Sequence, residues 1–491
     1  MEHTSVDVLI AGAGLSGIGA ACHLQRAFPN KSMVILERRQ AIGGTWDLFR
    51  YPGIRSDSSM QSFGYVLRPW KSLKIIGDGE SIRSYIAGTA REFGVDQKIQ
   101  YGLKILSADW LSEQAIWSVI AMDEAIGIEK HFKAKFYISC TGYYDYDEGF
   151  SPAFAGQERF QGQCIHPQHW PKELDYAGKK IVVIGSGATA VTIVPAMAEK
   201  AAHVTMLQRS PSYFFTVPSF DKLSELLLKF LPERWVYGFA RARMIEAPHW
   251  LYLACKRWPS KMRSFMLKKA RKHLGESFDM RHFSPTYMPW EQRLCAVPDG
   301  DLFGALKSGK ASIVTDQIER FTERGIKLAS GQELEADIIV TATGLKLKMV
   351  GGVKISMDGL AIAPQKVLTY KGVLLEGIPN LAWIFGYTNA SWTLKSDLAA
   401  QYVCRLLKHM DEQQWDVAIA VDQGDNASEA GMMESLQSTY VQRSQDAMPR
   451  QGKLGPWKVT MNYKLDKRMM LDEPLLDGIL EFKKVLGSSP A

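Results

Sequence analysis

The chain has 491 residues, of which 46% are hydrophobic and 23% are charged. This length exceeds what one compact core accommodates, so two or three domains are expected. The net charge of +7 is mild for the size and does not indicate nucleic-acid binding. Six scattered cysteines without a C-x-x-C pair suit reduced thiols in a cytoplasmic protein rather than a disulfide framework. No secretory signal and no run of 18 apolar residues is found, so neither export nor a membrane-spanning helix is predicted.

The first predicted unit is a strand, a glycine turn and a helix at residues 6–25, VDVLIAGAGLSGIGAACHLQ. Gly12 allows the turn, Gly14 lets the backbone approach a pyrophosphate, and Gly17 lets helix and strand pack closely. Ser16 lies at the helix start, where N–H groups and the helix dipole attract phosphate. The next strand, SMVILE, ends in Glu37, where an acid can accept hydrogen bonds from a ribose 2′-OH. The unit therefore predicts a dinucleotide site.

The segment 43–57, GGTWDLFRYPGIRSD, holds a glycine pair, a tryptophan, an aromatic-Pro-Gly run and an aspartate. It resembles the flavin-side motif of Baeyer–Villiger monooxygenases. The matching positions are Gly43, Gly44, Trp46, Tyr51, Pro52, Gly53 and Asp57. The resemblance implies that the flavin is contacted by Gly44, Thr45, Trp46, Arg55, Ser56 and Asp57. It also implies that the backbone of Ile105 touches the adenine.

Residues 160–171, FQGQCIHPQHWP, form a connecting segment rich in large side chains. The segment matches the family fingerprint F-x-G-x-x-x-H-x-x-x-W-P at every position. Because it precedes a second glycine turn, we interpret it as a hinge connection whose anchors are Phe160, Gly162, His166, Trp170 and Pro171. His166 and His169 are three residues apart, but no cysteine or acid cluster supports a metal site. Asp145, Asp147 and Glu148, just upstream, suggest a solvated turn.

The second predicted unit begins with a strand at 180–184 and the turn Gly185-x-Gly187-x-x-Ala190, to which Ser186, Ala188 and Thr189 also belong. Its next strand ends in Arg209 rather than in an acid. An arginine here suits a 2′-phosphate, and Gln208 and Ser210 flank it. Two sites of opposite charge imply two different dinucleotides, FAD at the first and NADPH at the second.

Two hydrophobic strands, 136–144 and 336–345, each end in Thr-Gly, and in flavoproteins with two dinucleotides such strands return the chain toward the cofactors. The expected domains are an FAD-binding part over 1–150, a linker over 151–178, an NADP-binding domain over 179–335 and a second FAD-binding part over 336–491. A helical insertion is expected at about 215–290. Residues 222–272 contain 13 Lys and Arg against 3 Glu, with tryptophans interleaved. This insertion is interpreted as part of the substrate pocket, with peripheral contact to a membrane surface as the alternative.

Arg293, in PWEQRLC, matches the active-site arginine of the family. The resemblance implies that Arg293 stabilises a C4a-peroxyflavin anion and the oxyanion formed on a ketone, and that Asp57 holds its guanidinium. Runs such as RYPGIRSD and GYTNASWTLKSD place the chain near the branch that includes the ethionamide-activating monooxygenase of mycobacteria. Gln292 stands where many relatives carry a lysine, and YTNASWT replaces their usual late active-site segment. Substrate preference therefore does not carry over from the cyclic-ketone enzymes.

The expected fold is α/β, with two Rossmann-like domains, the NADP domain being inserted into the FAD domain. The expected activity is NADPH- and O2-dependent oxidation of ketones to esters, together with oxygenation of sulfur in small molecules. Two alternatives are an N- or S-oxygenating flavin monooxygenase and a non-oxygenating pyridine-nucleotide reductase. The second alternative needs a redox cysteine pair, which the sequence lacks. The expected location is the cytoplasm, with membrane contact left open.

Overall fold

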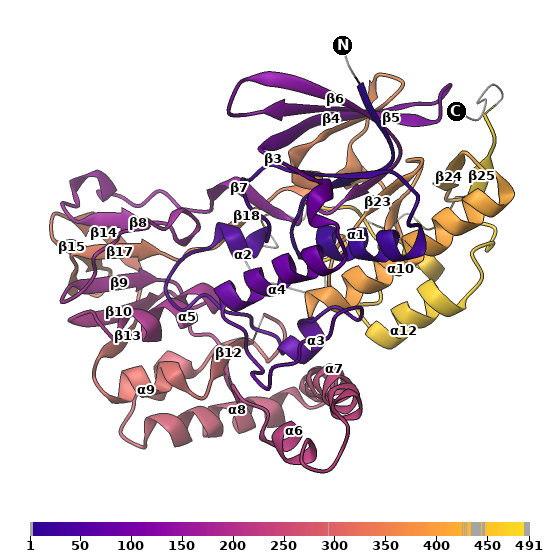
Figure 1. Ribbon diagram of the computed structural model, residues 1–491. Coiled ribbons are helices and arrows are strands. Elements are labelled where there is room, and N and C mark those ends of the chain that lie inside the picture. Colours follow the sequence, from indigo (N-terminus) through magenta and orange to yellow (C-terminus); the bar gives the residue numbers. More distant parts are fainter. Residues whose placement is uncertain are drawn as a thin grey trace.

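The computed structural model describes residues 3–292, 294–424, 426, 428, 430–433, 443 and 447–485. Two sheets organise this part of the chain (Figure 1). The larger sheet lies at the top of the view, the smaller sheet lies at its left, and a group of helices lies below both.

The larger sheet is built around a parallel core that begins with β1 (His3–Ala11). β1 pairs in parallel with β2 (Met33–Glu37) and with β6 (Ile128–Ser139), so β1, α1 (Leu15–Ala27) and β2 form the predicted strand–turn–helix unit. The sheet order is β20 (Leu360–Ala361), β19 (Lys354–Met357), β4 (Leu103–Leu111), β5 (Ile116–Asp123), β6, β1, β2 and β3 (Ile99–Tyr101). Three further strands join through β6: β23 (Leu381–Trp383), β22 (Leu374–Leu375) and β21 (Thr369–Tyr370).

Three helices cover the larger sheet beside the first glycine turn: α1, α4 (Gly79–Glu92) and α10 (Trp392–Gln413). α1 packs against α10, and a buried polar contact of 3.1 Å joins His23 to Asp397 between them. Two short helices, α2 (Thr45–Leu48) and α3 (Met60–Phe63), lie on the loop between β2 and α4. The C-terminal part adds β24 (Val417–Ala420), α12 (Tyr463–Lys467), a π-helical turn at Arg468–Asp472 and β25 (Leu480–Lys483). A buried Lys395–Asp466 pair at 2.9 Å holds this part against α10.

The smaller sheet is entirely parallel, in the order β13 (Ala311–Thr315), β10 (His203–Gln208), β9 (Lys180–Ile184), β17 (Ile338–Thr341) and β8 (Gln163–Ile165). β9, α5 (Ala188–Met197) and β10 form the second strand–turn–helix unit, and α9 (Asp301–Lys307) packs beside α5. An antiparallel group of β14 (Ile318–Thr322), β15 (Gly325–Leu328) and β16 (Glu333–Glu335) packs on the face of this sheet opposite α5. The predicted α/β fold with two Rossmann-like units is confirmed.

The structure differs from the expected boundaries at two places. β8 lies inside the segment expected to be a linker, and β17 lies beyond residue 335, yet both strands belong to the smaller sheet. The chain crosses between the sheets through β7 (Tyr144–Gly149) and returns through β18 (Leu345–Leu347), and these strands pair antiparallel. We call β7 and β18 the crossover ribbon.

A helical insertion leaves the smaller unit between two paired strands, β11 (Phe214–Val217) and β12 (Cys295–Pro298). It contains α6 (Lys222–Leu227), α7 (Glu233–Arg257) and α8 (Pro259–Leu274). Short 3-10 turns occur elsewhere at Asp96–Lys98, Gln157–Arg159, Pro167–His169, Met280–Phe283, Met349–Gly352, Pro364–Lys366 and Gly455–Trp457. Among the described helices, none has the length and apolar character needed to cross a membrane.

Candidate active site

The first glycine turn leaves no room for a side chain at Gly12 or at Gly17. Gly12 has φ +99°, and a Cβ there would lie 2.8 Å from the carbonyl oxygen of Cys140. A Cβ on Gly17 would lie 1.8 Å from the carbonyl oxygen of Gly12. α1 starts at Leu15 without a capping side chain from the described residues, so its first-turn N–H groups remain available to an anion. The turn therefore fits a dinucleotide pyrophosphate.

Glu37 stands beside this turn at the end of β2 and is buried. One carboxylate oxygen accepts a hydrogen bond from the Ala13 N–H at 2.7 Å, and the other accepts from the Arg39 N–H at 2.8 Å. Burial raises the pKa of Glu37, while these two hydrogen bonds act in the opposite direction. The acid thus helps to shape the turn as well as standing where a ribose would bind.

The flavin-side segment 43–57 lies directly on the first turn. The Gly43 N–H donates to the Ala13 carbonyl at 3.1 Å, and a Cβ on Gly44 would lie 2.9 Å from the Cα of Gly14. Thr45 opens α2 at this point and hydrogen-bonds to the half-buried Tyr146. The next residue, Trp46, packs edge-on against Phe63 at 5.7 Å between ring centroids. The two glycine motifs are therefore in contact, as a flavin site requires.

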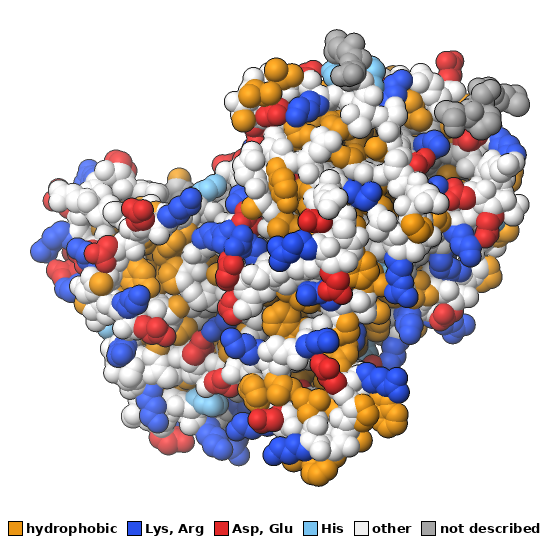
Figure 2. All heavy atoms as spheres, viewed as in Figure 1, with side chains coloured by type: hydrophobic (Ala, Val, Ile, Leu, Met, Phe, Trp, Pro, Cys, Tyr) orange, Lys and Arg blue, Asp and Glu red, His pale blue; other side chains and the backbone are white. Residues whose placement is uncertain are grey.

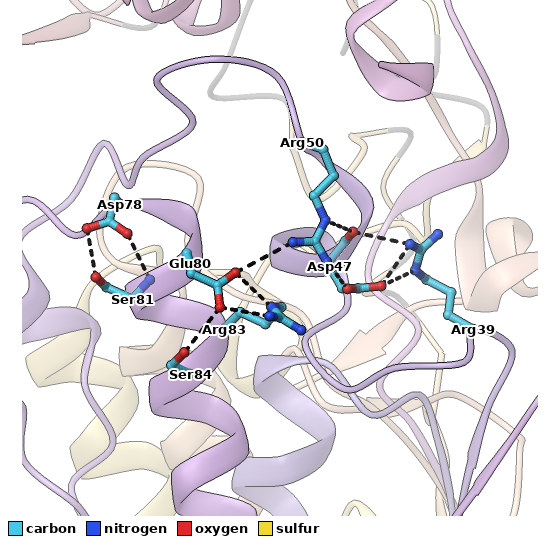
Figure 3. Close-up of polar contacts among 8 residues, drawn as sticks. All are labelled: Arg39, Asp47, Arg50, Asp78, Glu80, Ser81, Arg83 and Ser84. Atoms are coloured by element: carbon cyan, nitrogen blue, oxygen red, sulfur yellow. Dashed lines mark hydrogen bonds and ion pairs between the residues drawn. The ribbon is translucent and has the colours of Figure 1, made fainter. Parts of the chain in front are cut away.

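A chain of charged side chains holds the flavin-side segment in place (Figure 3). Asp47 is buried and accepts hydrogen bonds from Arg39 Nε at 2.9 Å and Nη2 at 2.8 Å, and it also pairs with Arg50. Arg50 reaches Glu80 on α4 at 3.6 Å, and Glu80 pairs with Arg83 at 2.7 Å. We call this set the Asp47 ion chain. No local pattern in the sequence indicated it.

The same segment also packs into the core of the smaller unit. Tyr51 is buried, burial raises its pKa to about 12, and its hydroxyl hydrogen-bonds to the Thr189 side chain. A Cβ on Gly53 would lie 2.8 Å from the Cβ of Ala196 and 2.9 Å from the Thr192 carbonyl oxygen, both on α5. The flavin-side segment thus contacts both glycine turns, with Gly44 on the first and Tyr51 on the second.

The second glycine turn is more open than the first. A Cβ on Gly185 would lie 2.4 Å from the Ala342 carbonyl oxygen, but around Gly187 no described atom lies within 4 Å of such a Cβ. Ser186 Oγ bonds to the Ser210 carbonyl at 3.3 Å and to the Ser212 hydroxyl at 2.8 Å. Ala188, Thr189 and Ala190 form the first turn of α5, which starts without a side-chain cap from the described residues.

The residues expected at the 2′-phosphate separate into two groups. Arg209 and Ser210 are exposed beside the second turn. Gln208 is buried instead, and its amide donates to the His282 carbonyl and to Thr315 Oγ1, both at 2.8 Å. Its side chain holds β10 against its neighbours rather than facing the phosphate position.

Arg443 supplies a further positive charge that the sequence did not indicate. Its guanidinium lies 3.5 Å from the centroid of the Phe150 ring. Burial lowers the pKa of Arg443, and the positive charge of Arg209 lowers it further. Two arginines from distant parts of the chain therefore share one electrostatic environment beside the second turn.

Arg55 and Ser56 make structural contacts next to the predicted catalytic aspartate. Arg55 pairs with Asp301 at the start of α9, while its buried Nη2 has no partner among the described residues. Ser56 Oγ donates to the Ser58 carbonyl at 2.9 Å and accepts from the Gly77 N–H at 3.2 Å. Asp57 is exposed at the end of the segment. The unpartnered nitrogen of Arg55 fits a role toward an anionic ligand.

Arg293, the predicted catalytic arginine, lies outside the described residues, but its neighbours on both sides are placed. The Tyr287 carbonyl accepts from the Tyr213 hydroxyl at 2.7 Å, and the Tyr287 side chain hydrogen-bonds to Ser212. Cys295 Sγ contacts the Ser186 carbonyl oxygen at 3.7 Å. Tyr287 and Cys295 therefore both lie beside the second glycine turn.

Ser16, expected at the pyrophosphate, already has a partner. Its hydroxyl accepts a hydrogen bond from the indole of Trp392 at 2.8 Å, which leaves its own proton free to be donated to another group. Trp392 stacks on Tyr143 with 5.1 Å between ring centroids. Trp392 belongs to the YTNASWT run, so the departure from related enzymes reaches the first glycine turn itself.

Ile105, expected at the adenine, lies in β4 and packs half-buried against the core cluster that contains Trp110 and Trp117. Its side chain has a packing role there. The implied adenine contact involves only its backbone and stays a prediction.

The fingerprint segment lies mainly on the smaller unit. Phe160 packs edge-on against Phe321 at 6.4 Å, and Trp170 packs half-buried on the core that contains α5. Gly162 has no room for a side chain, because a Cβ would lie 2.3 Å from the Asp337 carbonyl oxygen. Pro171 is exposed where the segment ends.

His166 connects the fingerprint segment to the crossover ribbon. Its Nε2 lies 3.2 Å from the Gly344 carbonyl oxygen, and its Nδ1 accepts from the Gln168 N–H at 3.2 Å. Both bonds suit a neutral ring that carries its proton on Nε2. The ring fills the space beside Gly149, where a Cβ would lie 1.9 Å from its Cε1 atom.

Upstream residues expected to form a solvated turn instead form strand β7, and that expectation was wrong. Asp145 is buried and pairs with Lys348 at 2.8 Å, Asp147 pairs with Arg38 at 2.6 Å, and Glu148 pairs with Lys346. These ion pairs join the ribbon strands to each other and to the larger unit. Within the described ranges, no group of three or more His, Cys, Asp or Glu side chains is placed to hold a metal ion.

Comparison with known proteins identifies the family. Residues 76–414 match the flavin-binding monooxygenase-like family, and residues 10–68 match an NAD(P)-binding Rossmann-like domain. The chain belongs to the flavin-binding monooxygenase-like family. The predicted monooxygenase class and the predicted dinucleotide-binding units are thereby confirmed.

Similar proteins extend over nearly the whole chain. The Mycobacterium tuberculosis protein MymA, whose name describes an FAD-containing monooxygenase, is 59% identical over 480 residues, covering 97% of both chains. The FAD-containing monooxygenase EthA of the same species is 49% identical over 485 residues, covering 98% of both chains.

Solved structures share the fold. An oxidized steroid monooxygenase bound to NADP superposes with a TM-score of 0.71 at 21% identity, covering 86% of this chain and 88% of that chain. Cyclohexanone monooxygenase from Rhodococcus sp. Phi1 bound to NADP+ also gives 0.71, at 20% identity, covering 86% and 87%. At this level of identity, the likeness shows the fold alone.

Proposed function

We propose that the chain is an FAD-containing, NADPH- and O2-dependent monooxygenase that oxidises ketones to esters by the Baeyer–Villiger reaction. It also oxygenates sulfur in thioethers and thioamides. In the balanced reaction, a ketone, O2, NADPH and a proton yield an ester, water and NADP+. Relatives named as FAD-containing monooxygenases and neighbours bound to NADP support both cofactors.

The observation that carries this proposal is the double contact of the flavin-side segment. Gly44 lies against Gly14 of the first turn, while Tyr51 bonds to Thr189 of the second. A hydride donor on one turn and a flavin on the other would therefore face a shared segment that ends in Asp57. This arrangement suits direct hydride transfer from NADPH to the flavin, because that transfer requires the two reacting atoms to be held about 3–3.5 Å apart.

The FAD site would be formed by the first turn and the flavin-side segment, through Gly12, Gly14, Ser16, Gly17, Glu37, Gly44, Thr45, Trp46, Arg55, Ser56, Asp57 and Ile105. The NADPH site would be formed by Gly185, Ser186, Gly187, Ala188, Thr189, Ala190, Arg209 and Ser210, with Gln208 supporting the strand. Bound FAD would supply the electron transfer and oxygen activation that side chains lack. The residues supply binding, orientation and exclusion of water.

Arg293 is proposed as the fixed cation of the site. A guanidinium remains protonated at any working pH, so it can stabilise negative charge that develops on oxygen as the ketone is attacked. Asp57 would orient that guanidinium from the end of the flavin-side segment. Tyr287 and Cys295, which precede and follow Arg293 in the sequence, lie beside the second turn.

We propose the domain division that the sequence indicates, except that β8 and β17 belong to the smaller unit, with the fingerprint segment as the hinge between the units. His166 bonds to the ribbon through Gly344, while Phe160 and Trp170 are anchored in the smaller unit. Rotation of that unit about the ribbon would close the site over the substrate and exclude water.

The test uses purified holoenzyme with NADPH and 18O2, with a linear ketone and a thioether offered in parallel. Mass spectrometry should find one 18O atom in the ester and one in the sulfoxide. Sulfoxide without ester would assign the chain to heteroatom oxygenation instead. NADPH consumption that yields only hydrogen peroxide would contradict both activities. All six cysteines are described, and none of them is joined to another in a disulfide.

The Arg293→Ala variant should separate reduction from oxygenation. NADPH should still bleach the flavin colour, whereas ester formation should fall by at least about 100-fold, the usual effect of removing a charge-stabilising group. Arg293→Lys is the control, since it keeps the charge but loses the planar fork. Ester formation by Arg293→Ala at the parent rate would refute the role.

A further inference from the structure

The exposed aromatic side chains of the molecule are concentrated in one place. Every exposed Phe and Trp of the described residues lies between positions 220 and 265, although the chain has 21 Phe and 13 Trp in all. They are Phe220, Phe230, Trp235, Phe239, Trp250, Trp258 and Phe265. Phe230, in the turn after α6, is 77% exposed. Scattered apolar residues are normal on a surface, but such a concentration marks an interaction site.

The exposed large hydrophobic side chains of α7 lie on one stripe of the helix. Trp235, Phe239, Trp250 and Leu253 are separated by four, eleven and three residues, which places them within one narrow face at 3.6 residues per turn. Leucines of α6 and the turn after it continue the stripe at Leu223, Leu226, Leu228 and Leu231. We call these exposed residues and the basic residues around them the α6–α8 face. Figure 2 shows hydrophobic side chains gathered at the lower edge, over α6 and α7, with Lys and Arg beside them.

The basic excess of the chain is concentrated in the same segment. Residues 222–272 contain 13 Lys and Arg against 3 Glu, while the whole chain contains 59 against 52 acidic residues. The remaining residues therefore hold 46 basic against 49 acidic side chains and are slightly negative. Ten of the 13 basic side chains are exposed: Lys222, Lys229, Arg234, Lys256, Arg257, Lys261, Lys268, Lys269, Arg271 and Lys272. Lys269 lies 5.0 Å from the Phe265 ring centroid, so charge and aromatic surface are interleaved.

The inner side of the same helices is fixed to the protein. Arg241 Nη1 donates to the carbonyls of Gln61 at 2.8 Å and Gly64 at 2.9 Å, which anchors α7 on α3. Tyr252 packs edge-on against Trp290 at 5.5 Å between ring centroids, next to the segment that contains Arg293. The outer stripe is therefore presented by a rigid support close to the candidate active site.

We propose that the α6–α8 face docks on the surface of an anionic lipid bilayer. Its leucines and phenylalanines would enter the boundary between head groups and acyl chains, its tryptophans would lie at that interface, and its lysines and arginines would pair with anionic head groups. A second copy of the chain fits less well, because two faces with the same positive charge would repel each other. A nucleic acid would use the basic and aromatic residues but leave the exposed leucines of α6 without a partner.

Vesicle co-sedimentation of the full-length holoenzyme tests this proposal. Vesicles of phosphatidylcholine alone would be compared with vesicles that contain about 30 mol % phosphatidylglycerol, at low and at high salt. Binding should be at least about tenfold stronger to the anionic vesicles and should weaken with salt. Equal binding to both vesicles, or binding to neither, would overturn the proposal.

Two pairs of variants locate the surface. Phe230→Ser combined with Trp235→Ser should lower vesicle binding at least about tenfold, while Leu360→Ser combined with Leu476→Ser, equally exposed elsewhere, should not change it. Lys222→Glu with Lys229→Glu should lower binding, and Lys172→Glu with Lys354→Glu, also exposed, should have less effect. The ratio of flavin to protein absorbance and the melting temperature should be unchanged in every variant, which shows that each is folded.

Two other partners for the α6–α8 face, a second copy of the chain and a nucleic acid, would each give a different experimental result. Dimer formation in analytical ultracentrifugation that is lost in the Phe230→Ser/Trp235→Ser variant, without vesicle binding, would assign the face to a second copy. Binding of a single-stranded oligonucleotide without vesicle binding would assign it to nucleic acid. Either result would overturn the proposal.

Discussion

The two strand–turn–helix units are built alike but present opposite environments. In the first, Gly12 and Gly17 leave no space for a Cβ, and Glu37 is buried and bonded to the turn. In the second, no described atom lies within 4 Å of a Cβ placed on Gly187, and Arg209 is exposed. A closed, acidic turn suits a cofactor that stays bound, whereas an open, basic turn suits one that enters and leaves with every turnover.

The largest expected difference is between alanine substitutions of one glycine in each turn. Gly17→Ala forces a Cβ to within 1.8 Å of the Gly12 carbonyl oxygen, so the first turn cannot form and the protein should be unfolded or colourless. Gly187→Ala should keep the flavin and the melting temperature, because its Cβ meets open space. The ratio of flavin to protein absorbance measures the flavin content of each variant, and a thermal melt measures its melting temperature. Normal flavin content in Gly17→Ala would show that the first turn is not closed.

A smaller effect tests the rigidity of the first site. Asp47→Ala removes the buried carboxylate at the centre of the Asp47 ion chain and should lower the free energy of unfolding by about 2 kcal/mol. The loss is limited because Arg39 and Arg50 are partly exposed and can be hydrated once Asp47 is gone. Denaturant unfolding of the holoenzyme measures it. Glu80→Gln is the control, because Glu80 is 60% exposed and should cost less than about 0.5 kcal/mol. Equal losses for the two variants would mean that burial of Asp47 is unimportant.

The basic character of the second site is tested by removing the charge of Arg209. Arg209→Gln should lower kcat/KM for NADPH about tenfold, equivalent to about 1.4 kcal/mol, and leave kcat/KM for NADH nearly unchanged. Steady-state kinetics with both nucleotides measure it. A parallel loss with NADH would show that Arg209 supports the fold rather than the 2′-phosphate.

The smallest effect concerns His166 between the two units. Burial lowers the pKa of His166 below its ordinary value, so the unfolded chain takes up the proton first as the pH falls. The contribution of His166 to stability is therefore present above about pH 6.5 and is lost as the pH falls below that value. Thermal melts from pH 7.5 to 5.5 should show a steeper loss for the parent than for His166→Asn. If the melting temperature falls with pH equally in both proteins, protonation of His166 does not contribute to the loss of stability.

The sequence predicted those features that depend on neighbours along the chain. The glycine turns, the acid and the arginine at the strand ends, and the helical insertion all follow from short spacings. It did not predict the Asp47 ion chain, whose members extend from Arg39 to Arg83 without a shared period. It also missed strand β7, because the strand that pairs with β7 is β18, about two hundred positions later in the chain. Gln208 was expected beside the 2′-phosphate, and this stays a prediction; its strand position directs its side chain inward, while Arg209 faces solvent.

The crossover ribbon has a consequence for how this architecture can be altered. Leu345 pairs with Gly149, so the chain enters and leaves the smaller unit at neighbouring points of one ribbon. A segment whose ends meet in this way can be exchanged as a cassette, because a foreign segment with the same end spacing closes without stretching the backbone. Chimaeras joined at these two positions should keep the flavin half of one parent while taking the nicotinamide preference of the other.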